Sequence, residues 1–372
     1  MPHAHSALIR KNTQATLEEG TFMHNLPHLT PCELLEKKIL LIRLSSLGDI
    51  VLTTPAIRAV RAHFPEAYIA MLVGKQSADV LRENPHLDEI ITFDRFAKDK
   101  DTGEMLRAVR VLRERKFTLA IDLQRKFRTA LLMYFSGATK RIGKGALCTV
   151  RVLERGNKHA TAHYLDLLHA AGIPAADQSL ELFLAESERR DASQRFDTAG
   201  VTQAGLKVGI FPGAGWKLRE WMPERFAAIG NRLVEQFNAE VLIFGGQKES
   251  ELVHTVVNLM DARAVPFAGN LQVRELAACI EKCDLFLTND TGPMHIAAAV
   301  GTPTVSLFGP GNHIRFQPLG GLHQTIRHDV PCSPCKQFTD KCQDNICMKK
   351  ITVDEVWHSI SDTLSACRLK NT

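Results

Sequence analysis

The sequence predicts an α/β protein built from two sheet-and-helix halves. Short apolar runs alternate with segments of helical periodicity over residues 38–122, and the same alternation restarts over residues 207–308. Residues 175–197, between the two series, are mostly polar and charged. Strands that alternate with helices indicate a parallel sheet with helices on both faces. We therefore expect two domains, which also agrees with a length of 372 residues.

The first half supplies four expected strands. Lys38-Ile-Leu-Leu-Ile-Arg43 is an apolar run with a charge at each end, and the polar turn Ser45–Asp49 follows it. The other strands are expected at 68–73, 89–93 and 117–122, and helices at 51–64 and 104–115, where apolar residues recur at helical spacing. We place the first domain at residues 37–190.

The second half repeats this order. Strands are expected at 207–211, 239–244, 285–287 and 303–308, and helices at 223–237, 249–260, 273–282 and 294–300. We place the second domain at residues 200–352. A last helix at 353–365, within a carboxy-terminal segment 353–372, is expected to cross back to the first domain.

The composition is that of an ordinary soluble globular protein, with 45% apolar and 23% charged residues. No apolar stretch is long enough to span a bilayer, and residues 1–31 lack the basic-then-apolar pattern of a signal peptide. We expect residues 1–36 to form a disordered tail and the protein to be cytoplasmic. The net charge is only +5, but the positive residues cluster along the chain.

One turn in the second half has the features of an anion-binding site. The apolar run that ends at Leu287 is followed by Asn289-Asp290-Thr291-Gly292 and by a helix-compatible segment with Pro293 in its first turn. The first amide groups of a helix lack partners within it, and the helix dipole favours negative charge there. Side chains of Asp290, Thr291 and His295 can add hydrogen bonds. An ordinary strand–helix connection explains this spacing about equally well.

Three blocks of the chain together resemble a known enzyme family. The segment Asn289-Asp-Thr-Gly-Pro-Met-His295 is similar to the nucleotide-binding signature of glycosyltransferase family 9, the ADP-heptose:lipopolysaccharide heptosyltransferases. Residues Arg43–Ala56 resemble the amino-terminal signature of that family. Phe211-Pro-Gly-Ala-Gly215 followed by Trp221–Phe226 resembles a third block, and the blocks stand in the family's order.

This resemblance implies the GT-B architecture, in which two Rossmann-like, doubly wound domains face a central cleft. It also implies an inverting transfer of heptose from ADP-heptose to an acceptor in the inner core of lipopolysaccharide, with no metal or other cofactor required. The first domain would bind the acceptor and the second the nucleotide sugar. Because that acceptor is lipid-linked, we expect transient contact with the inner membrane face.

Asp49 is the candidate catalytic base. An inverting transfer needs a base that takes the proton of the acceptor hydroxyl as it attacks the anomeric carbon. Asp49 follows a strand in the Ser-Ser-Leu-Gly-Asp turn, and the resemblance places the base of the family at this residue. The alternative is that Asp49 only caps the helix that begins beside it, because aspartate is a favoured cap residue.

Residues of the second half are the candidates for nucleotide-sugar binding. They are Gly213, Ala214, Lys217, Arg219, Glu249, Gly269, Asp290, Thr291, Gly292, Pro293 and His295. The glycines let backbone amides approach a phosphate, and the two cations can neutralise the diphosphate. The family usually has lysine where this chain has Arg219, so either cation could serve. By resemblance Glu249 binds the ribose hydroxyls, although a carboxylate matched to a helix dipole explains it equally well.

Basic residues of the first half are candidates for acceptor binding. Lys126, Arg128 and Arg141, with Lys140 and Lys144, form a positive cluster that would attract the carboxylates and phosphates of a lipopolysaccharide core. Ser46 in the amino-terminal signature is a further candidate. A solvated surface is an equally good explanation for any one of these cations. A nucleic-acid function is disfavoured, because no recognised module accompanies the charges.

Four of the nine cysteines lie close together near the carboxyl terminus. Cys332, Cys335, Cys342 and Cys347 form a Cys-x2-Cys-x6-Cys-x4-Cys pattern. Thiols so close in a cytosolic chain suggest a structural metal, but the spacing is not that of a standard zinc ribbon. Free thiols or one labile disulfide are the alternative, and no metal site is assigned firmly.

Two further functions remain compatible with the sequence. The same fold could use another nucleotide sugar or another acceptor, such as a protein. The chain could also be a non-catalytic nucleotide-binding module. An oxidoreductase is disfavoured, because the glycine-rich dinucleotide fingerprint is missing after the first strand.

Overall fold

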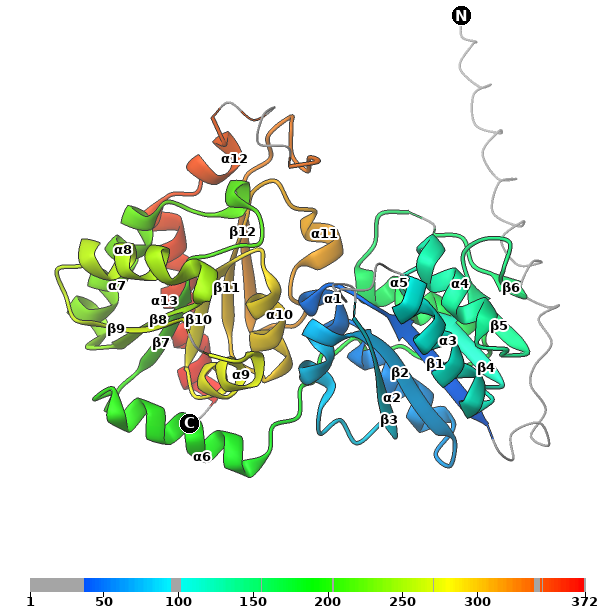
Figure 1. Ribbon diagram of the computed structural model, residues 1–372. Coiled ribbons are helices and arrows are strands. Elements are labelled where there is room, and N and C mark those ends of the chain that lie inside the picture. Colours follow the sequence, from blue (N-terminus) through cyan, green and yellow to red (C-terminus); the bar gives the residue numbers. More distant parts are fainter. Residues whose placement is uncertain are drawn as a thin grey trace, which may run out of the picture.

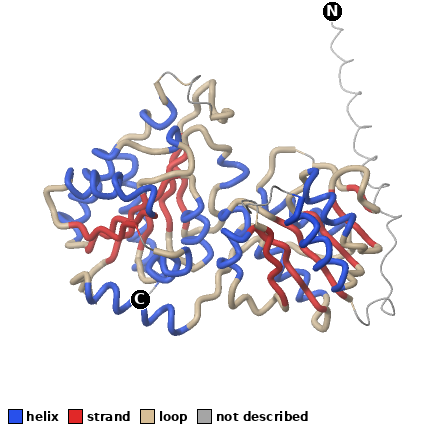
Figure 2. Tube along the Cα trace, viewed as in Figure 1, coloured by secondary structure: helices blue, strands red, loops and turns tan. Residues whose placement is uncertain are grey.

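The computed structural model describes residues 37–94, 102–154, 156–202, 204–269, 271–337, 342 and 344–370. The expected tail at 1–36 lies outside the described residues. Figure 1 shows two lobes side by side, each built on a sheet, and Figure 2 shows helices on both faces of the strands. The predicted α/β class with two parallel sheets is confirmed.

The first sheet has the strand order β3-β2-β1-β4-β5-β6, and each neighbouring pair is parallel. Its strands are β1 (Lys38–Arg43), β2 (Tyr68–Gly74), β3 (Glu89–Phe93), β4 (Leu119–Asp122), β5 (Lys140–Gly143) and β6 (Val150–Arg151). Its helices are α1 (Leu47–Val51), α2 (Thr54–His63), α3 (Thr102–Arg115), α4 (Phe127–Phe135) and α5 (Ala160–Ala170). The central strand β1 has four fully buried apolar residues, which is why its sequence reads as one apolar run.

The second sheet has the order β12-β11-β10-β7-β8-β9, again parallel throughout. Its strands are β7 (Lys207–Phe211), β8 (Glu240–Gly246), β9 (Ala264–Gly269), β10 (Leu285–Asn289), β11 (Thr304–Phe308) and β12 (His323–Arg327). The helices of this half are α6 (Glu186–Thr198), α7 (Pro223–Phe237), α8 (Ser250–Leu259), α9 (Val273–Glu281), α10 (Gly292–Ala299), α11 (His313–Phe316), α12 (Ile346–Lys349) and α13 (Val353–Lys370). No described helix has the length and apolar composition that crossing a membrane requires.

One expectation about helices was wrong, and one short helix was missed. The helix expected at 51–64 is α2, which begins at Thr54. The missed helix, α1, begins at Leu47 inside the expected turn, and the chain breaks between the two. The hydroxyls of Thr53 and Thr54 donate to backbone carbonyls three residues earlier at this break. The carboxy-terminal helix α13 does not cross back to the first domain. Val356 and Ile360 on α13 belong to the apolar core of the second sheet, which holds the helix there.

The sequence did not predict strands β5 and β6, at one edge of the first sheet, or the helices α4 and α5 beside them. Strands β5 and β6 have four and two residues, and α4 and α5 are largely apolar without a clear helical stripe. Such short elements carry too few periodic positions to be distinguished from loops. Strand β12 was missed for a similar reason, since it alternates polar residues with only partly buried ones.

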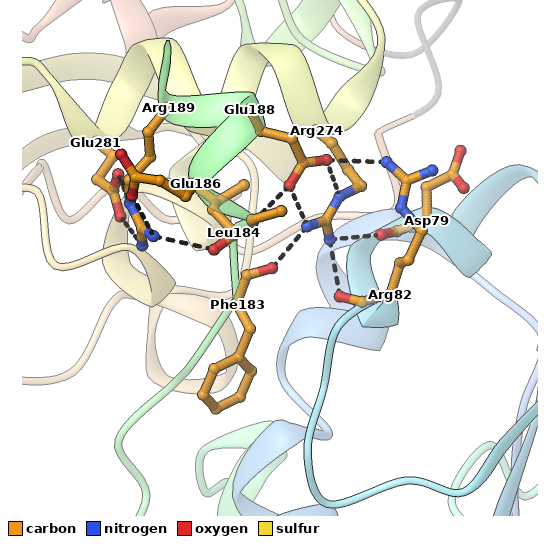
Figure 3. A network of polar contacts seen from close by, with 10 residues as sticks. Asp79, Arg82, Phe183, Leu184, Glu186, Glu188, Arg189, Arg274 and Glu281 are labelled. Carbon is orange, nitrogen blue, oxygen red and sulfur yellow. Dashed lines mark hydrogen bonds and ion pairs between the residues drawn. The ribbon is translucent and has the colours of Figure 1, made fainter. Parts of the chain in front are cut away.

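The two lobes contact each other through helices near the cleft and through a buried arginine behind it. Helix α1 of the first lobe packs on α10 of the second, and α6, which connects the two lobes, packs on α9. Arg274 on α9 is 3% exposed and donates to the backbone carbonyls of Asp79 and Arg82 in the first lobe and of Phe183 in the connecting segment. In Figure 3 the guanidinium of Arg274 contacts residues from separate segments of the chain.

A carboxylate on α6 completes this contact. Glu188 accepts from Nε and Nη2 of Arg274, both at 2.5 Å. A paired fork of this kind is the strongest geometry for an arginine–carboxylate contact. The hydrogen bonds from Arg274 outweigh partial burial and lower the pKa of Glu188 to about 2. The connecting helix is therefore fixed to both lobes by charge-assisted hydrogen bonds.

We predict that Glu188→Gln lowers the free energy of unfolding at pH 7 by about 2 kcal/mol, because it removes an ionised acceptor from a buried arginine. The pKa of Glu188 is depressed in the folded state, so its contribution is present above the ordinary carboxyl pKa and is lost as pH falls toward 2. Urea denaturation at pH 7 and pH 3 checks this. Glu186→Gln is the matched control on the same helix, since Glu186 is 70% exposed. Equal effects of the two substitutions would contradict the prediction.

Candidate active site

A pocket of about 550 Å³ lies between the two lobes and is lined by residues of both. The first lobe contributes the start of α1, and the second contributes the turns after β7, β8 and β10. The lining residues are Ser46, Leu47, Gly48, Asp49, Phe211, Ala214, Gly215, Trp216, Arg219, Gly245, Gly246, Glu249, Leu271, Val273, Leu276, Asp290, Thr291, Gly292, Pro293, His295 and Phe316. The expected turns therefore share one cavity, as ligand sites at the carboxyl ends of parallel strands do.

Asp49 is held in this pocket by three contacts. One carboxylate oxygen accepts from the amide and the hydroxyl of Ser46, at 3.0 and 2.9 Å, and the other lies 2.6 Å from Nη2 of Arg43. The contact with Ser46 is a helix cap, and the side chain also lines the pocket. Burial by itself would raise the pKa of Asp49, but Arg43 and Ser46 outweigh it and hold the pKa below its ordinary value. Asp49 is therefore ionised at neutral pH.

Arg43 is placed for this role by the end of strand β1. Its side chain is 12% exposed, its guanidinium lies 5.2 Å from the ring centre of buried Tyr164, and it donates to the carbonyl of Leu123. These contacts hold the planar guanidinium of Arg43 in one orientation, with Nη2 directed at the carboxylate of Asp49. Arg43 opens the amino-terminal signature, but it was not predicted to be functional from the sequence.

Gly48 allows helix α1 to approach helix α10. A Cβ at Gly48 would lie 2.6 Å from Cδ2 of His295 and 3.4 Å from Cα of Gly292. Only glycine therefore fits at this contact. His295 is 5% exposed, and burial lowers its pKa to about 4, so the imidazole is neutral at neutral pH.

The amino terminus of α10 faces the pocket. Thr291 is the residue before the helix, Pro293 occupies its first turn, and both line the cavity with Gly292. The first amides of α10 are therefore available to an anion in the pocket. Asn289, which the sequence analysis did not assign a role, secures this turn. Its side-chain Nδ2 donates to the carbonyl of Pro212 at 2.7 Å, and its side-chain Oδ1 accepts from the backbone amide of Trp221 at 3.2 Å.

Arg219 supplies the positive charge of the pocket. Nη1 of Arg219 lies 3.1 Å from the carboxylate of Asp290, and its Nε donates to Oε1 of Gln337 at 2.6 Å. Burial raises the pKa of Asp290 to about 6 against the opposing effect of Arg219, so the carboxylate is mostly ionised at neutral pH. Asp290 therefore holds the guanidinium of Arg219 at the pocket by an ion pair. Lys217 instead lines a neighbouring depression, is 77% exposed and pairs with Glu220.

Glu249 lies over the glycine turns of the second lobe. Cβ atoms at Gly213 and Gly245 would lie 2.4 Å and 3.0 Å from atoms of the Glu249 side chain, so both glycines give it room. Gly213 itself is not among the lining residues, and neither is Gly269, whose φ of +96° favours glycine. Apolar Leu271 and Leu276 line the cavity nearby, and of these two Leu276 was not predicted.

The basic candidates of the first lobe lie away from this pocket. Lys126 and Arg128 flank the first residue of α4, outside the lining. Arg141 donates to the carbonyls of Ala138 and Leu147, at 2.7 and 2.9 Å. Both of these hydrogen bonds lie within the first lobe. Of the predicted acceptor-binding residues, the structure brings only Ser46 into the cavity.

The cysteine cluster does not assemble a metal site in the described part of the chain. No three His, Cys, Asp or Glu side chains among those residues gather closely enough to hold a metal ion. All four thiols are free, and Cys347 is buried. Burial, with smaller effects of Cys332, Cys342 and Cys335, raises the pKa of Cys347 to about 11.

The chain matches a known protein family over more than half of its length. The family described as glycosyltransferase family 9 (heptosyltransferase) matches residues 105–345. The chain belongs to glycosyltransferase family 9. The match covers the second lobe and the later part of the first, and the family identifies the chain as a glycosyltransferase.

Two heptosyltransferases and one solved family 9 structure resemble the chain over most of its length. Lipooligosaccharide heptosyltransferase 2 of Campylobacter jejuni is 28% identical over 326 residues, which is 84% of this chain and 95% of the relative. Lipopolysaccharide heptosyltransferase 2 of Escherichia coli is 26% identical over 309 residues, 78% of this chain and 88% of the relative. The crystal structure of a family 9 glycosyltransferase from Veillonella parvula superposes with a TM-score of 0.81 at 26% identity, covering 89% of this chain and 98% of that one.

We predict that Arg219→Gln weakens the binding of ADP about tenfold to a hundredfold, because it removes one charge-assisted contact to a diphosphate. Lys217→Gln, two residues away, is the matched control and should change the dissociation constant less than about twofold, since an exposed cation contributes little. Isothermal titration calorimetry of both variants decides between the two cations. A larger effect at Lys217 would reverse the assignment.

Proposed function

We propose that this chain is an inverting heptosyltransferase that moves heptose from ADP-heptose to the inner core of lipopolysaccharide. One observation carries the proposal. In a family 9 chain, an ionised carboxylate from one lobe and an arginine with a helix amino terminus from the other line the same pocket. The names of its relatives as lipopolysaccharide and lipooligosaccharide heptosyltransferases support this choice of sugar and acceptor.

In this proposal the second domain, 200–352, holds the donor. Arg219 and the amides of α10 at Thr291 and Gly292 would bind the diphosphate. Neutral His295 would contribute a hydrogen bond, and Glu249 would accept hydrogen bonds from the ribose hydroxyls. The first domain, 37–190, would bind the acceptor and bring its hydroxyl to Asp49.

The chemistry follows from these charges. As the acceptor oxygen bonds to the anomeric carbon, its proton passes to the carboxylate of Asp49. The bond from that carbon to the diphosphate oxygen breaks on the opposite face, which inverts the configuration and releases ADP. Arg219 and the α10 amides stabilise the negative charge that grows on the leaving diphosphate. Because these groups supply the positive charge, we propose that no metal is required. We further propose a cytoplasmic enzyme in peripheral contact with the inner membrane, since its acceptor would be lipid-linked.

We predict that Asp49→Asn lowers kcat for ADP release by about 10²–10⁴-fold, the usual contribution of a positioned base. The assay uses ADP-heptose against a panel of other nucleotide sugars, with truncated core acceptors, in the presence and absence of EDTA. Asp79→Asn, an exposed aspartate of the same lobe, is the control. An unchanged rate for Asp49→Asn would refute the assignment of the base. Release from another nucleotide sugar alone would refute the donor, and loss of activity in EDTA would refute metal independence.

We predict that Arg43→Gln moves the acid limb of the pH–rate profile upward by about 1 pH unit or more, because an adjacent opposite charge lowers a carboxyl pKa by that amount. The base must be ionised, and without Arg43 only the hydrogen bonds from Ser46 oppose the effect of burial on the pKa of Asp49. Activity should therefore fall at a higher pH than in the wild type. Arg43→Lys should restore part of the shift. A profile that keeps its position while kcat falls at every pH would mean that Arg43 only maintains structure.

A further inference from the structure

Three exposed apolar side chains belong to segments that meet at the boundary between the two lobes. Phe127 is 77% exposed, Leu153 is 68% exposed and Ile314 is 40% exposed. They come from the start of α4, from the segment after β6 and from α11, so both lobes contribute. We call these three residues the apolar rim.

An ion-pair cluster brings the apolar rim together. Glu154 pairs with Arg125 of the first lobe, at 2.9 Å, and with Arg315 of the second. Leu153 and Ile314 are the immediate neighbours of Glu154 and Arg315 in sequence, and Phe127 lies two residues after Arg125. The three apolar side chains therefore belong to three segments joined by one carboxylate.

Further contacts hold α11 against the segment after β6. The amide of Asn312 donates to the side-chain oxygen of Asn157 at 3.0 Å. His159 contacts the carbonyl of Gln317, also at 3.0 Å. In Figure 1, α11 faces the first lobe on the side of the molecule opposite to α6. The apolar rim is thus a fixed feature of the cleft edge.

Three basic side chains accompany the apolar rim at the carboxyl-end edge of the first sheet. Lys126 lies four residues after the end of β4, Lys144 directly follows β5, and Arg151 is the last residue of β6. All three side chains are exposed. Within the described residues none of the three forms an ion pair, so their charges are not neutralised internally.

Apolar side chains scattered singly on a surface need no explanation. A group of them at one rim, next to uncompensated positive charge, is the pattern of surfaces that bind a membrane interface. Aromatic and aliphatic side chains enter the acyl boundary there while lysine and arginine contact anionic headgroups.

We propose that the apolar rim, with Lys126, Lys144 and Arg151, docks the protein on an anionic lipid bilayer with the cleft mouth toward the lipid. This surface deepens the proposed function and rests on it in one respect. A lipid-linked acceptor held in the bilayer would enter the cleft from the side where the apolar rim lies. The docking itself depends only on the surface, so it can be measured without glycosyl transfer.

The experiment is cosedimentation with large unilamellar vesicles. One set contains phosphatidylethanolamine and phosphatidylglycerol, and the other contains phosphatidylcholine alone. We expect the wild type to bind the anionic vesicles, to bind the neutral ones much more weakly, and to dissociate as salt is raised. Phe127→Ser combined with Leu153→Ser should weaken the binding by at least about tenfold. Leu259→Ser is the control, since Leu259 is 43% exposed at the end of α8, away from the cleft edge, and should bind as the wild type does.

Several results would overturn the proposal. Wild-type protein that stays in the supernatant with both vesicle types would do so, as would equal binding to anionic and neutral vesicles. Anionic-vesicle binding that survives the double substitution would also do so, provided thermal unfolding shows both proteins folded. If the double variant does not fold, Ile314→Ser alone provides the same comparison. Concentration-dependent dimerisation that the double substitution abolishes, without vesicle binding, would assign the rim to a second copy instead.

Activity on a short soluble acceptor separates this proposal from the proposed function. The double variant should release ADP at the wild-type rate with such an acceptor, because neither side chain lines the pocket. Wild type that binds anionic vesicles but releases no ADP from ADP-heptose would refute the proposed function and leave the docking surface standing.

Discussion

The packing of α1 against α10 is the constraint on which the pocket depends. Gly48 carries no side chain, and this allows the backbone of one lobe to approach Gly292 and His295 of the other. Asp49 is the next residue, so its carboxylate lies beside the amino terminus of α10 in a common cavity. Any side chain at Gly48 would collide with the imidazole of His295, which lines the same pocket.

Three arginine–carboxylate pairs then fix the geometry around this contact. Arg43 holds Asp49, Asp290 holds Arg219, and Glu188 holds Arg274 behind the cleft. Removing such charges from water costs free energy, so partly buried pairs are weak evidence for stability alone. Their common effect here is orientation. Each fixes a group that belongs either to the pocket or to the junction between the lobes.

The sequence by itself determined the two parallel α/β halves and most of their strands, because strands buried on both faces read as apolar runs such as residues 38–43. It also indicated the pocket turns, since glycine, proline and small polar residues follow those runs at 211–215 and 289–295. The resemblance to family 9 directed attention to Asp49 and His295. Short elements such as β5 and β6 escaped prediction, because two to four residues carry almost no periodic signal.

Only the tertiary structure decided which charged residues share a site. Sequence spacing could not choose between Lys217 and Arg219, and folding places Arg219 in the pocket with Asp290 and Gln337 as partners from distant segments. The sequence also grouped Arg141 with the acceptor site, whereas it bonds to carbonyls of its own lobe. The physical reason is the same in both cases. A pattern reports what a residue can do locally, but the direction of a long side chain depends on partners that only the folded chain brings near.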